Sequence, residues 1–333
     1  WRWIDTVTTQ LELSDAAPED LAVVLSSTAT DPELRDAARH ALERIGCAVV
    51  VLGPCGRAGV EDPLGNPVVL AGLRAADLVV DLADLVGHSS HRNELLLDTR
   101  VLAITVDRAA DLDRLVAHPG LARRVEHLDQ LLESATSLRL VSVEAESLDV
   151  ALEGSRRRLD RGVADRIGEL ARWPAGAVWV RPHSGGVAGA VVLLPGDILI
   201  EAQHLVRSPV RLEIEAGHLV EIIGESTDAD VLRSQLEADP HPDDAYQVSE
   251  IGLGLNLLRI GSPAGPFDAS KLSVGQGAAA AGCCSVRFGR ARAPSATVTM
   301  TSASALLDDR SIVEAGHLSG AVAPDVYERA AAR

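Results

Sequence analysis

Short apolar segments rich in β-branched residues recur along the first half of the chain, with helical patterns between them. Apolar runs of this length, bounded by polar or turn-forming residues, are typical of buried strands. Strands that alternate with helices predict a parallel sheet covered by helices on both faces. The expected strands are residues 47–52, 77–82, 100–106 and 138–143, and helical patterns separate them at residues 67–75 and 110–115.

Two further helices are predicted before the first of these strands. The segment 31–44 begins with Asp31, a preferred N-cap residue, followed by Pro32 at the first helical position. The segment 17–25 follows Asp15 and carries acidic residues in its first turn, which the helix dipole favours. Both segments are therefore expected to be helical.

The pattern changes after about residue 175 to short apolar strands divided by Pro and Gly turns, with one helix at residues 229–237. This half predicts a mixed, largely β domain. The fold class is therefore α/β, with an N-terminal parallel-sheet domain at residues 1–172 and an α+β domain at residues 173–333 that carries the site. The strands expected in this half are residues 177–181, 189–194, 197–200, 210–215 and 219–223.

Charge and hydropathy narrow the range of partners. The chain has 48 acidic and 31 basic residues and a formal net charge of -17. A surface of this charge repels phosphates, so nucleic acid is not an expected partner. No apolar run reaches the ~20 residues that a membrane-spanning helix needs, so no membrane partner is expected. No secretory signal is visible, so we expect a cytoplasmic protein.

Several phrases in the second half resemble motifs of a known family. They include Trp173-Pro-Ala-Gly, Ser249-Glu-Ile-Gly-Leu-Gly-Leu-Asn256 and the segments 189–197, 209–220 and 307–316. In these motifs the chain resembles the 2,5-dihydroxypyridine 5,6-dioxygenase family, which is itself similar to the aminopeptidase T metallopeptidases. The order of elements around residues 74–82 and 99–102 also matches that family.

The resemblance implies a metal site that this chain has lost. The related dioxygenases hold a non-haem iron through two histidines and one carboxylate. Glu250 stands at the place of the first histidine, and the His-x-Asp pair of the family falls on Ser295 and Thr297. The aminopeptidase relatives carry a histidine at the place of Ser285 and a Gly-Thr-Asp-Leu phrase at residues 145–148, neither of which is present. We therefore expect a degenerate metal site, with no metal and no other cofactor.

Three polar residues in the matching motifs could carry chemistry or binding. Glu250 is a candidate general acid or base, and the alternative is a loop glutamate in solvent. His183 lies in a Gly-rich turn and could exchange a proton near neutral pH, or be a surface histidine. Lys271, the only lysine, could bind an anionic substrate, or lie in solvent.

Two other groups of residues could bind a metal or act as a nucleophile. His88 and His91 would share a helix face, and could hold a metal together with Asp84, but a surface pair at a helix start is the simpler interpretation. Cys283 and Cys284 are a candidate nucleophile near a cationic side chain, although burial is favoured.

Together these features predict an enzyme that acts on a small aromatic or heteroaromatic molecule by metal-independent acid-base chemistry. Such chemistry covers hydrolysis, elimination, isomerisation or cyclisation. Glu250 and His183 are the expected catalytic residues. Two alternatives stay open: a non-haem iron dioxygenase with rearranged ligands, and a non-catalytic relative that binds small molecules. The expected substrate-binding residues are Asn256, Lys271, Ser285, Arg287, Ser295 and Thr297.

The protein is also expected to form a homodimer or a higher homo-oligomer, because two-domain proteins of this kind associate and a symmetric dimer is the simplest assembly.

Overall fold

The chain divides into two compact units in the computed structural model, which describes residues 2–53, 62, 64–115, 117–143, 146–257, 274–290, 293–325 and 328. Unit 1 comprises residues 1–122 and 161–175, and unit 2 comprises residues 123–160 and 176–333. The chain therefore leaves unit 1, returns to it once and finishes in unit 2.

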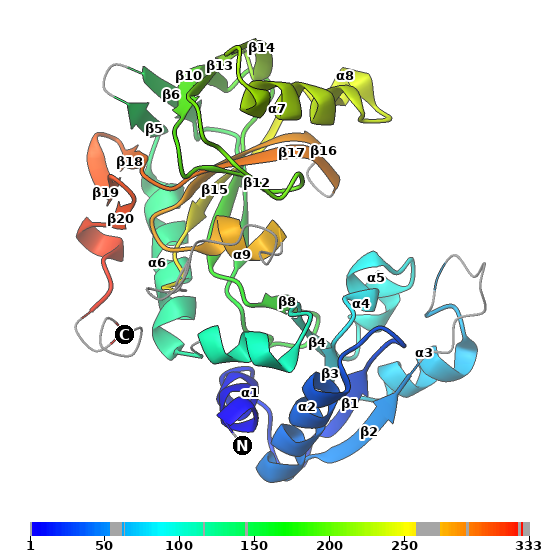
Figure 1. The fold of residues 1–333 in the computed structure, drawn as a ribbon. Coiled ribbons are helices and arrows are strands. Elements are labelled where there is room, and N and C mark those ends of the chain that lie inside the picture. The colour runs from blue at the N-terminus through cyan, green and yellow to red at the C-terminus, as the bar shows by residue number, and fades with distance from the viewer. Residues whose placement is uncertain are drawn as a thin grey trace. The chain divides into compact units, whose positions relative to one another are not determined.

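Unit 1 contains a parallel sheet with the strand order β2-β1-β3-β4-β8 in the described part of the chain (Figure 1). Its core includes Val23, Leu73, Val79 and Val101, all at most 2% exposed. The strands are β1 (Leu21–Leu25), β2 (Ala48–Leu52), β3 (Leu78–Asp81), β4 (Arg100–Ile104) and β8 (Leu170–Trp173). The helices are α1 (Arg2–Leu13), α2 (Pro32–Ile45), α3 (Pro67–Arg74), α4 (Leu85–His88), α5 (Arg92–Leu95) and the 3-10 helix η1 (Ala109–Arg114).

The prediction for the N-terminal segment was half right. α2 begins as expected, because the Asp31 side chain accepts a hydrogen bond from the main-chain nitrogen of Glu33 at 3.0 Å. The predicted helix at 17–25 is wrong, since Leu21–Leu25 form β1, which pairs with β2 on one side and β3 on the other. A strand buried in this way is uniformly apolar, so its sequence lacks the alternation that marks an exposed strand.

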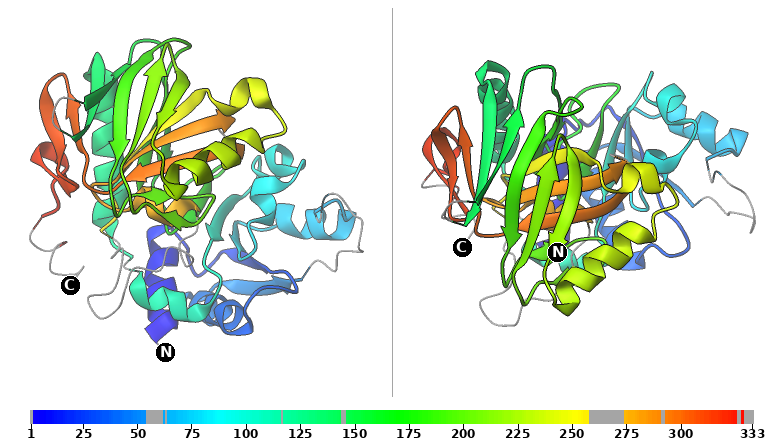
Figure 2. Two further views of the ribbon diagram at one scale, coloured as in Figure 1. Left: turned by 45° about the horizontal axis from the view of Figure 1, so that its top comes forward. Right: turned by 90° about the horizontal axis from the view of Figure 1, so that it is seen from above.

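Unit 2 contains two sheets, largely antiparallel, among the described residues. One has the order β14-β13-β10-β6-β5-β18-β19-β20 and the other the order β12-β11-β17-β16-β15-β9-β7. Helix α7 packs against β14 and β17, which belong to different sheets (Figures 1 and 2). The strands of the first sheet are β5 (Ser137–Val143), β6 (Glu146–Ala151), β10 (Val187–Leu193), β13 (Val210–Glu215), β14 (His218–Ile223), β18 (Ser304–Leu307), β19 (Arg310–Glu314) and β20 (His317–Leu318). Those of the second are β7 (Arg156–Asp160), β9 (Ala177–Arg181), β11 (Ile198–Leu199), β12 (His204–Leu205), β15 (Val248–Gly254), β16 (Cys284–Arg290) and β17 (Ala293–Met300). The helices of this unit are α6 (Pro119–Ser134, which belongs to it from residue 123), α7 (Thr227–Glu237), α8 (Pro242–Ala245), α9 (Val274–Ala279) and the 3-10 helix η3 (Gly320–Val322).

The fold class predicted from the sequence is confirmed, with one strand reassigned. The segment 138–143 was expected in the parallel sheet, but it forms β5 and pairs antiparallel with β6 and β18 in unit 2. An apolar strand can pair in either direction, so the run alone did not identify its sheet.

The second sheet of unit 2 has two chemically different faces. Alternate residues of a strand point to opposite faces, and one face of this sheet is apolar and almost fully buried. The other face carries arginine, glutamate, serine and threonine side chains from the same strands. The apolar face includes Val178, Val180, Ile251, Leu253, Val286, Phe288 and Val298, each at most 1% exposed.

Among the described residues, no helix is long and apolar enough to cross a membrane.

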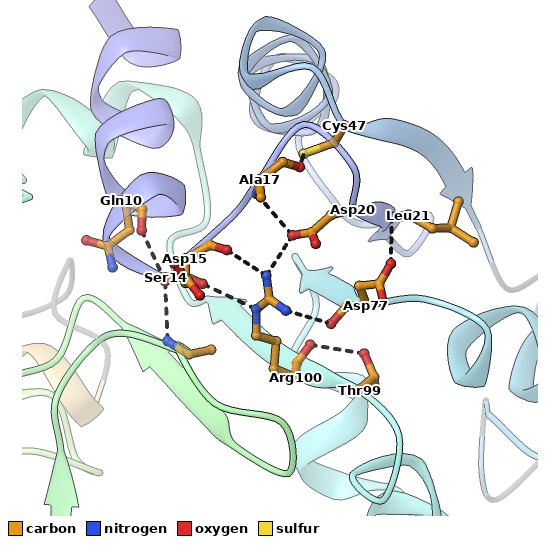
Figure 3. Close-up of polar contacts among 11 residues, drawn as sticks. Gln10, Ser14, Asp15, Ala17, Asp20, Leu21, Cys47, Asp77, Thr99 and Arg100 are labelled. Carbon is orange, nitrogen blue, oxygen red and sulfur yellow. Dashed lines mark hydrogen bonds and ion pairs between the residues drawn. The ribbon is translucent and has the colours of Figure 1, made fainter.

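In unit 1, the side chain of Arg100 binds the loop that precedes β1 (Figure 3). Its Nη2 lies 2.6 Å from Asp20 Oδ2, and both side chains are nearly buried, at 10% and 12% exposed. The same guanidinium donates to the main-chain oxygens of Ser14, Asp15 and Asp77 at 2.8 to 3.4 Å. A buried cation with this number of acceptors keeps the loop fixed to the start of β4.

Replacing Asp20 by Ala leaves the charge of Arg100 buried without its counter-ion. We expect the free energy of unfolding to fall by about 3 kcal/mol or more, measured by urea denaturation. The matched control is Asp5→Ala, because Asp5 pairs with Arg44 in the same unit but is 66% exposed. The control should lose no more than about 1 kcal/mol. Equal losses in the two variants would contradict this account of the Arg100 pair.

Candidate functional site

Glu250 is a buried carboxylate that binds three arginines. It lies on β15 and is 1% exposed. Its Oε1 accepts a hydrogen bond from Arg181 Nη2 at 3.0 Å, and its Oε2 accepts from Arg287 Nη1 at 2.9 Å and from Arg158 Nη2 at 3.4 Å. β15 lies between β9 and β16, and Glu250 is paired with Arg287 in register, so the two nearer arginines flank it from the neighbouring strands.

Trp179 and Asp160 complete the group around these arginines. Asp160 Oδ2 accepts from Trp179 Nε1 at 2.9 Å, and its Oδ1 accepts from Arg158 Nη1 at 2.5 Å. The guanidinium carbon of Arg287 lies 3.6 Å from the centre of the Trp179 ring, within the range of a cation–π contact. We call this group the arginine cluster: Arg158, Asp160, Trp179, Arg181, Glu250 and Arg287.

Gly252 makes room for the tryptophan of the arginine cluster. It is paired with Trp179 in register, and a Cβ atom added to it would lie 2.6 Å from an atom of the Trp179 ring. A side chain at position 252 would therefore displace the ring that supports Arg287. Residues 252–254 are extended backbone at the end of β15.

Two of the arginines have shifted pKa values. Burial lowers the pKa of Arg287 from its ordinary value, and the Glu250 carboxylate opposes that effect. The pKa of Arg158 is raised, because Asp160 and Glu250 outweigh the effect of burial, which is the largest single influence and acts to lower it. Guanidinium groups stay charged near neutral pH. Three cations thus face two carboxylates within the described cluster.

The residues at the expected metal position do not fit an iron site. Glu250, Arg287 and Thr297 lie in one row across three neighbouring strands. Strands are roughly 4.8 Å apart, so the main chains of Glu250 and Thr297 are separated by roughly 10 Å. Arg287 lies on the strand between them, and its guanidinium is bonded to Glu250 Oε2. That cation would repel a metal ion. Nor does any group of three His, Cys, Asp or Glu side chains in the described ranges form a metal-binding arrangement.

The three hydroxyl residues predicted to bind substrate already have protein partners. Thr297 Oγ1 donates to Glu201 at 2.7 Å, and Ser285 Oγ lies 2.8 Å from Thr299 Oγ1. Ser295 Oγ donates to Asp239 in a short hydrogen bond. Ser285 and Thr297 are fully buried. Among the predicted substrate-binding residues, Arg287 is therefore bonded to Glu250. Ser285, Ser295 and Thr297 are bonded to other residues.

The remaining predicted residues, His183, Asn256 and Lys271, are not among the partners of Glu250 in the described part of the chain. His183 is exposed in the turn after β9, where its Nδ1 lies 2.8 Å from the main-chain oxygen of Ser184. No hydrogen bond or ion pair joins it to Glu250 in the part of the chain that is described. Asn256 is buried, and its main chain bonds to the end of α9. Lys271 lies outside the described residues.

The histidine pair has neighbours from its own segment, and Cys283 and Cys284 are buried. His88 Nδ1 lies 2.8 Å from the main-chain oxygen of Asp84, and His91 lies beside Glu94.

Burial raises the pKa of Cys283 to about 12, and it also raises the pKa of the fully buried Cys284. These thiols stay protonated near neutral pH, which is inconsistent with a cysteine nucleophile.

Most of the arginine cluster was not predicted from the sequence. Arg158, Asp160, Trp179 and Arg181 were not singled out, although a signal was present. Trp179 and Arg181 are two residues apart on one strand, as are Arg158 and Asp160, and residues at this spacing share a face. Nothing in the sequence indicated that the two strands pair with each other.

The chain is similar to known proteins over most of its length. The model of the 2,5-dihydroxypyridine 5,6-dioxygenase family matches residues 2–259. The 2,5-dihydroxypyridine 5,6-dioxygenase of Pseudomonas putida is 28% identical over 261 residues, 74% of this chain and 73% of that protein. The solved structure of the dioxygenase from Pseudomonas putida KT2440 has a TM-score of 0.78 and 25% identity, over 97% of this chain and 98% of the other. Aminopeptidase T from Thermus thermophilus shares the fold, with a TM-score of 0.56 and 14% identity over 95% and 99% of the two chains.

Replacing Glu250 by Ala leaves the guanidinium groups of the cluster without their shared acceptor. We expect the free energy of unfolding to fall by about 3 to 5 kcal/mol, measured as a shift in the denaturation midpoint. Glu250→Gln, which keeps an acceptor oxygen, should lie between that variant and the unchanged protein.

The control for Glu250→Ala is Glu213→Ala in the other sheet of unit 2. Glu213 pairs with Arg211 at 2.9 Å but is 36% exposed, so its loss should cost about 1 kcal/mol or less. A Glu250→Ala variant no less stable than Glu213→Ala would show that the arginine cluster is not a buried ionic network.

Proposed function

The chain belongs to the 2,5-dihydroxypyridine 5,6-dioxygenase family, and from that premise we propose that it is an enzyme acting on a small aromatic or heteroaromatic molecule. The class of substrate follows from the relative of Pseudomonas putida, whose name gives a dihydroxylated pyridine as its substrate. We further propose that the reaction is metal-independent acid-base chemistry centred on Glu250.

The arginine cluster is the observation that carries the metal-independent part of the proposal. The family resemblance places a metal-binding histidine at position 250, and here that position holds a carboxylate bound by Arg158, Arg181 and Arg287. A divalent cation bound to Glu250 would meet three guanidinium groups at close range and would be repelled by them, although two of those side chains are 41% and 48% exposed. The arginines would instead stabilise negative charge on a bound substrate.

We propose that Glu250 takes a proton from the substrate where its hydrogen bonding is weakest. The contact of its Oε2 with Arg158 Nη2 is the longest of the three, at 3.4 Å, so a substrate proton would reach the carboxylate there at the least cost. His183 would act from the exposed turn through Nε2, because its Nδ1 is engaged by the main-chain oxygen of Ser184. In this scheme Glu250 and His183 transfer protons, and the arginines stabilise negative charge on the substrate.

The engagement of both oxygens of Glu250 also favours a second candidate, a non-catalytic relative that binds small aromatic molecules. A thermal-shift screen of aromatic and heteroaromatic compounds, followed by mass spectrometry of each compound that binds, separates the two. A changed compound supports the enzyme, and a compound recovered unchanged supports the binding protein.

The metal-independent proposal is tested by loading the purified protein with Fe(II) without oxygen, removing free metal and measuring bound iron by mass spectrometry. We expect no stoichiometric iron and no consumption of 2,5-dihydroxypyridine when oxygen is added. The dioxygenase of Pseudomonas putida, treated in the same way, is the positive control. One tightly held iron per chain together with oxygen-dependent loss of the pyridine would instead establish an iron dioxygenase with rearranged ligands.

A further inference from the structure

We infer that the arginine cluster binds a carboxylate group carried by the ring of the ligand. The inference deepens the proposed function, on which it rests, by naming the chemical class of the ligand: a small aromatic or heteroaromatic carboxylate.

The cluster has one more positive charge than negative charge among its described members. Arg158, Arg181 and Arg287 carry three positive charges, while Glu250 and Asp160 carry two negative charges and are both already bonded to arginines. This local excess lies in a chain whose formal net charge is -17. The cluster can therefore attract an anion that most of the protein surface would repel.

Arg181 offers unused donors to solvent. Its side chain is 48% exposed, and in the part of the chain that is described it donates only through Nη2, to Glu250. Its Nε and Nη1 thus have no protein acceptor there. The side chain of Arg158 is 41% exposed. Planar guanidinium groups bind carboxylates through paired hydrogen bonds, which are among the strongest in proteins.

Arg287 supplies a buried donor that lacks an acceptor. The residue is 8% exposed, and its Nε has no hydrogen-bond partner among the described residues. Leaving a donor of a charged group buried and unpaired is costly, and an oxygen of a ligand would remove that cost. The ring of Trp179, 3.6 Å from the guanidinium carbon, fixes the plane of Arg287. Trp179 is itself only 2% exposed, so it supports the arginine and leaves the ligand to the guanidinium groups.

The test compares ligand pairs that differ only in charge. Benzoate and pyridine-4-carboxylate are titrated into the full-length protein by isothermal calorimetry, beside benzamide and pyridine-4-carboxamide. We expect saturable binding of the carboxylates and at least about tenfold weaker binding of the amides, since a hydrogen bond to a charged group is worth more than one to a neutral group. Equal affinity for acids and amides, or no binding of either carboxylate, would overturn the inference.

Two substitutions locate the binding site. Arg181→Gln should weaken carboxylate binding about tenfold, because it removes the most accessible charge of the cluster. Arg139→Gln is the matched control: Arg139 is 47% exposed and bonded to Asp149 at 2.6 Å, but it lies in the other sheet. Equal weakening in both variants would show a general charge effect and overturn the assignment. Arg181→Lys, which keeps the charge, should retain part of the affinity if Arg181→Gln does not fold.

The outcome is separable from that of the proposed function. Bound iron with ring cleavage would refute the metal-independent proposal whatever the carboxylates do. Carboxylates that bind at Arg181 and are recovered unchanged would support this inference and favour the non-catalytic alternative. Turnover of an uncharged aromatic compound, with no carboxylate bound, would support the proposed enzyme and refute the inference.

Discussion

The burial of Glu250 constrains how β7, β9, β15 and β16 pair in the second sheet of unit 2. A carboxylate that is 1% exposed is stable only if its charge is compensated nearby, and here the partners come from β7, β9 and β16. A one-residue slip of any of these strands would turn its arginine to the apolar face. The ion pairs therefore require the same register that buries Val180, Ile251 and Val286 on the opposite face.

The positions that the family resemblance implies for a metal hold other residues in this chain. The chain retains the family fold over nearly its whole length, yet the residues at the positions implied for the metal each have a protein partner. Thr297 binds Glu201, Ser295 binds Asp239, and Glu250 binds arginines. These partners satisfy polar groups that would otherwise be buried without hydrogen bonds. The altered positions are therefore integrated into the fold.

Unit 1 illustrates where local patterns mislead. The acidic residues before Leu21 resemble the first turn of a helix, but Asp20 instead binds Arg100, which lies 80 residues further along the chain. Leu21–Leu25 then lie between two parallel strands, where nothing is exposed enough to show an alternating pattern. The helix that does precede this strand, Arg2–Leu13, was not recognised, although Val7 and Leu11 place apolar side chains four residues apart on one face.

The sequence by itself determined the fold class, the capping of α2 at Asp31 and the family resemblance, because periodicity, capping and motifs are all local properties. It did not determine that residues 123–160 group with the second half of the chain or that residues 161–175 group with the first. Nor did it reveal the arginine cluster. Arg158 and Arg181 lie 92 and 69 residues from Glu250 along the chain, and only the pairing of β7, β9, β15 and β16 brings their charges together. Strand pairing over such separations depends on which apolar faces can be buried together, and that is decided by the tertiary structure as a whole.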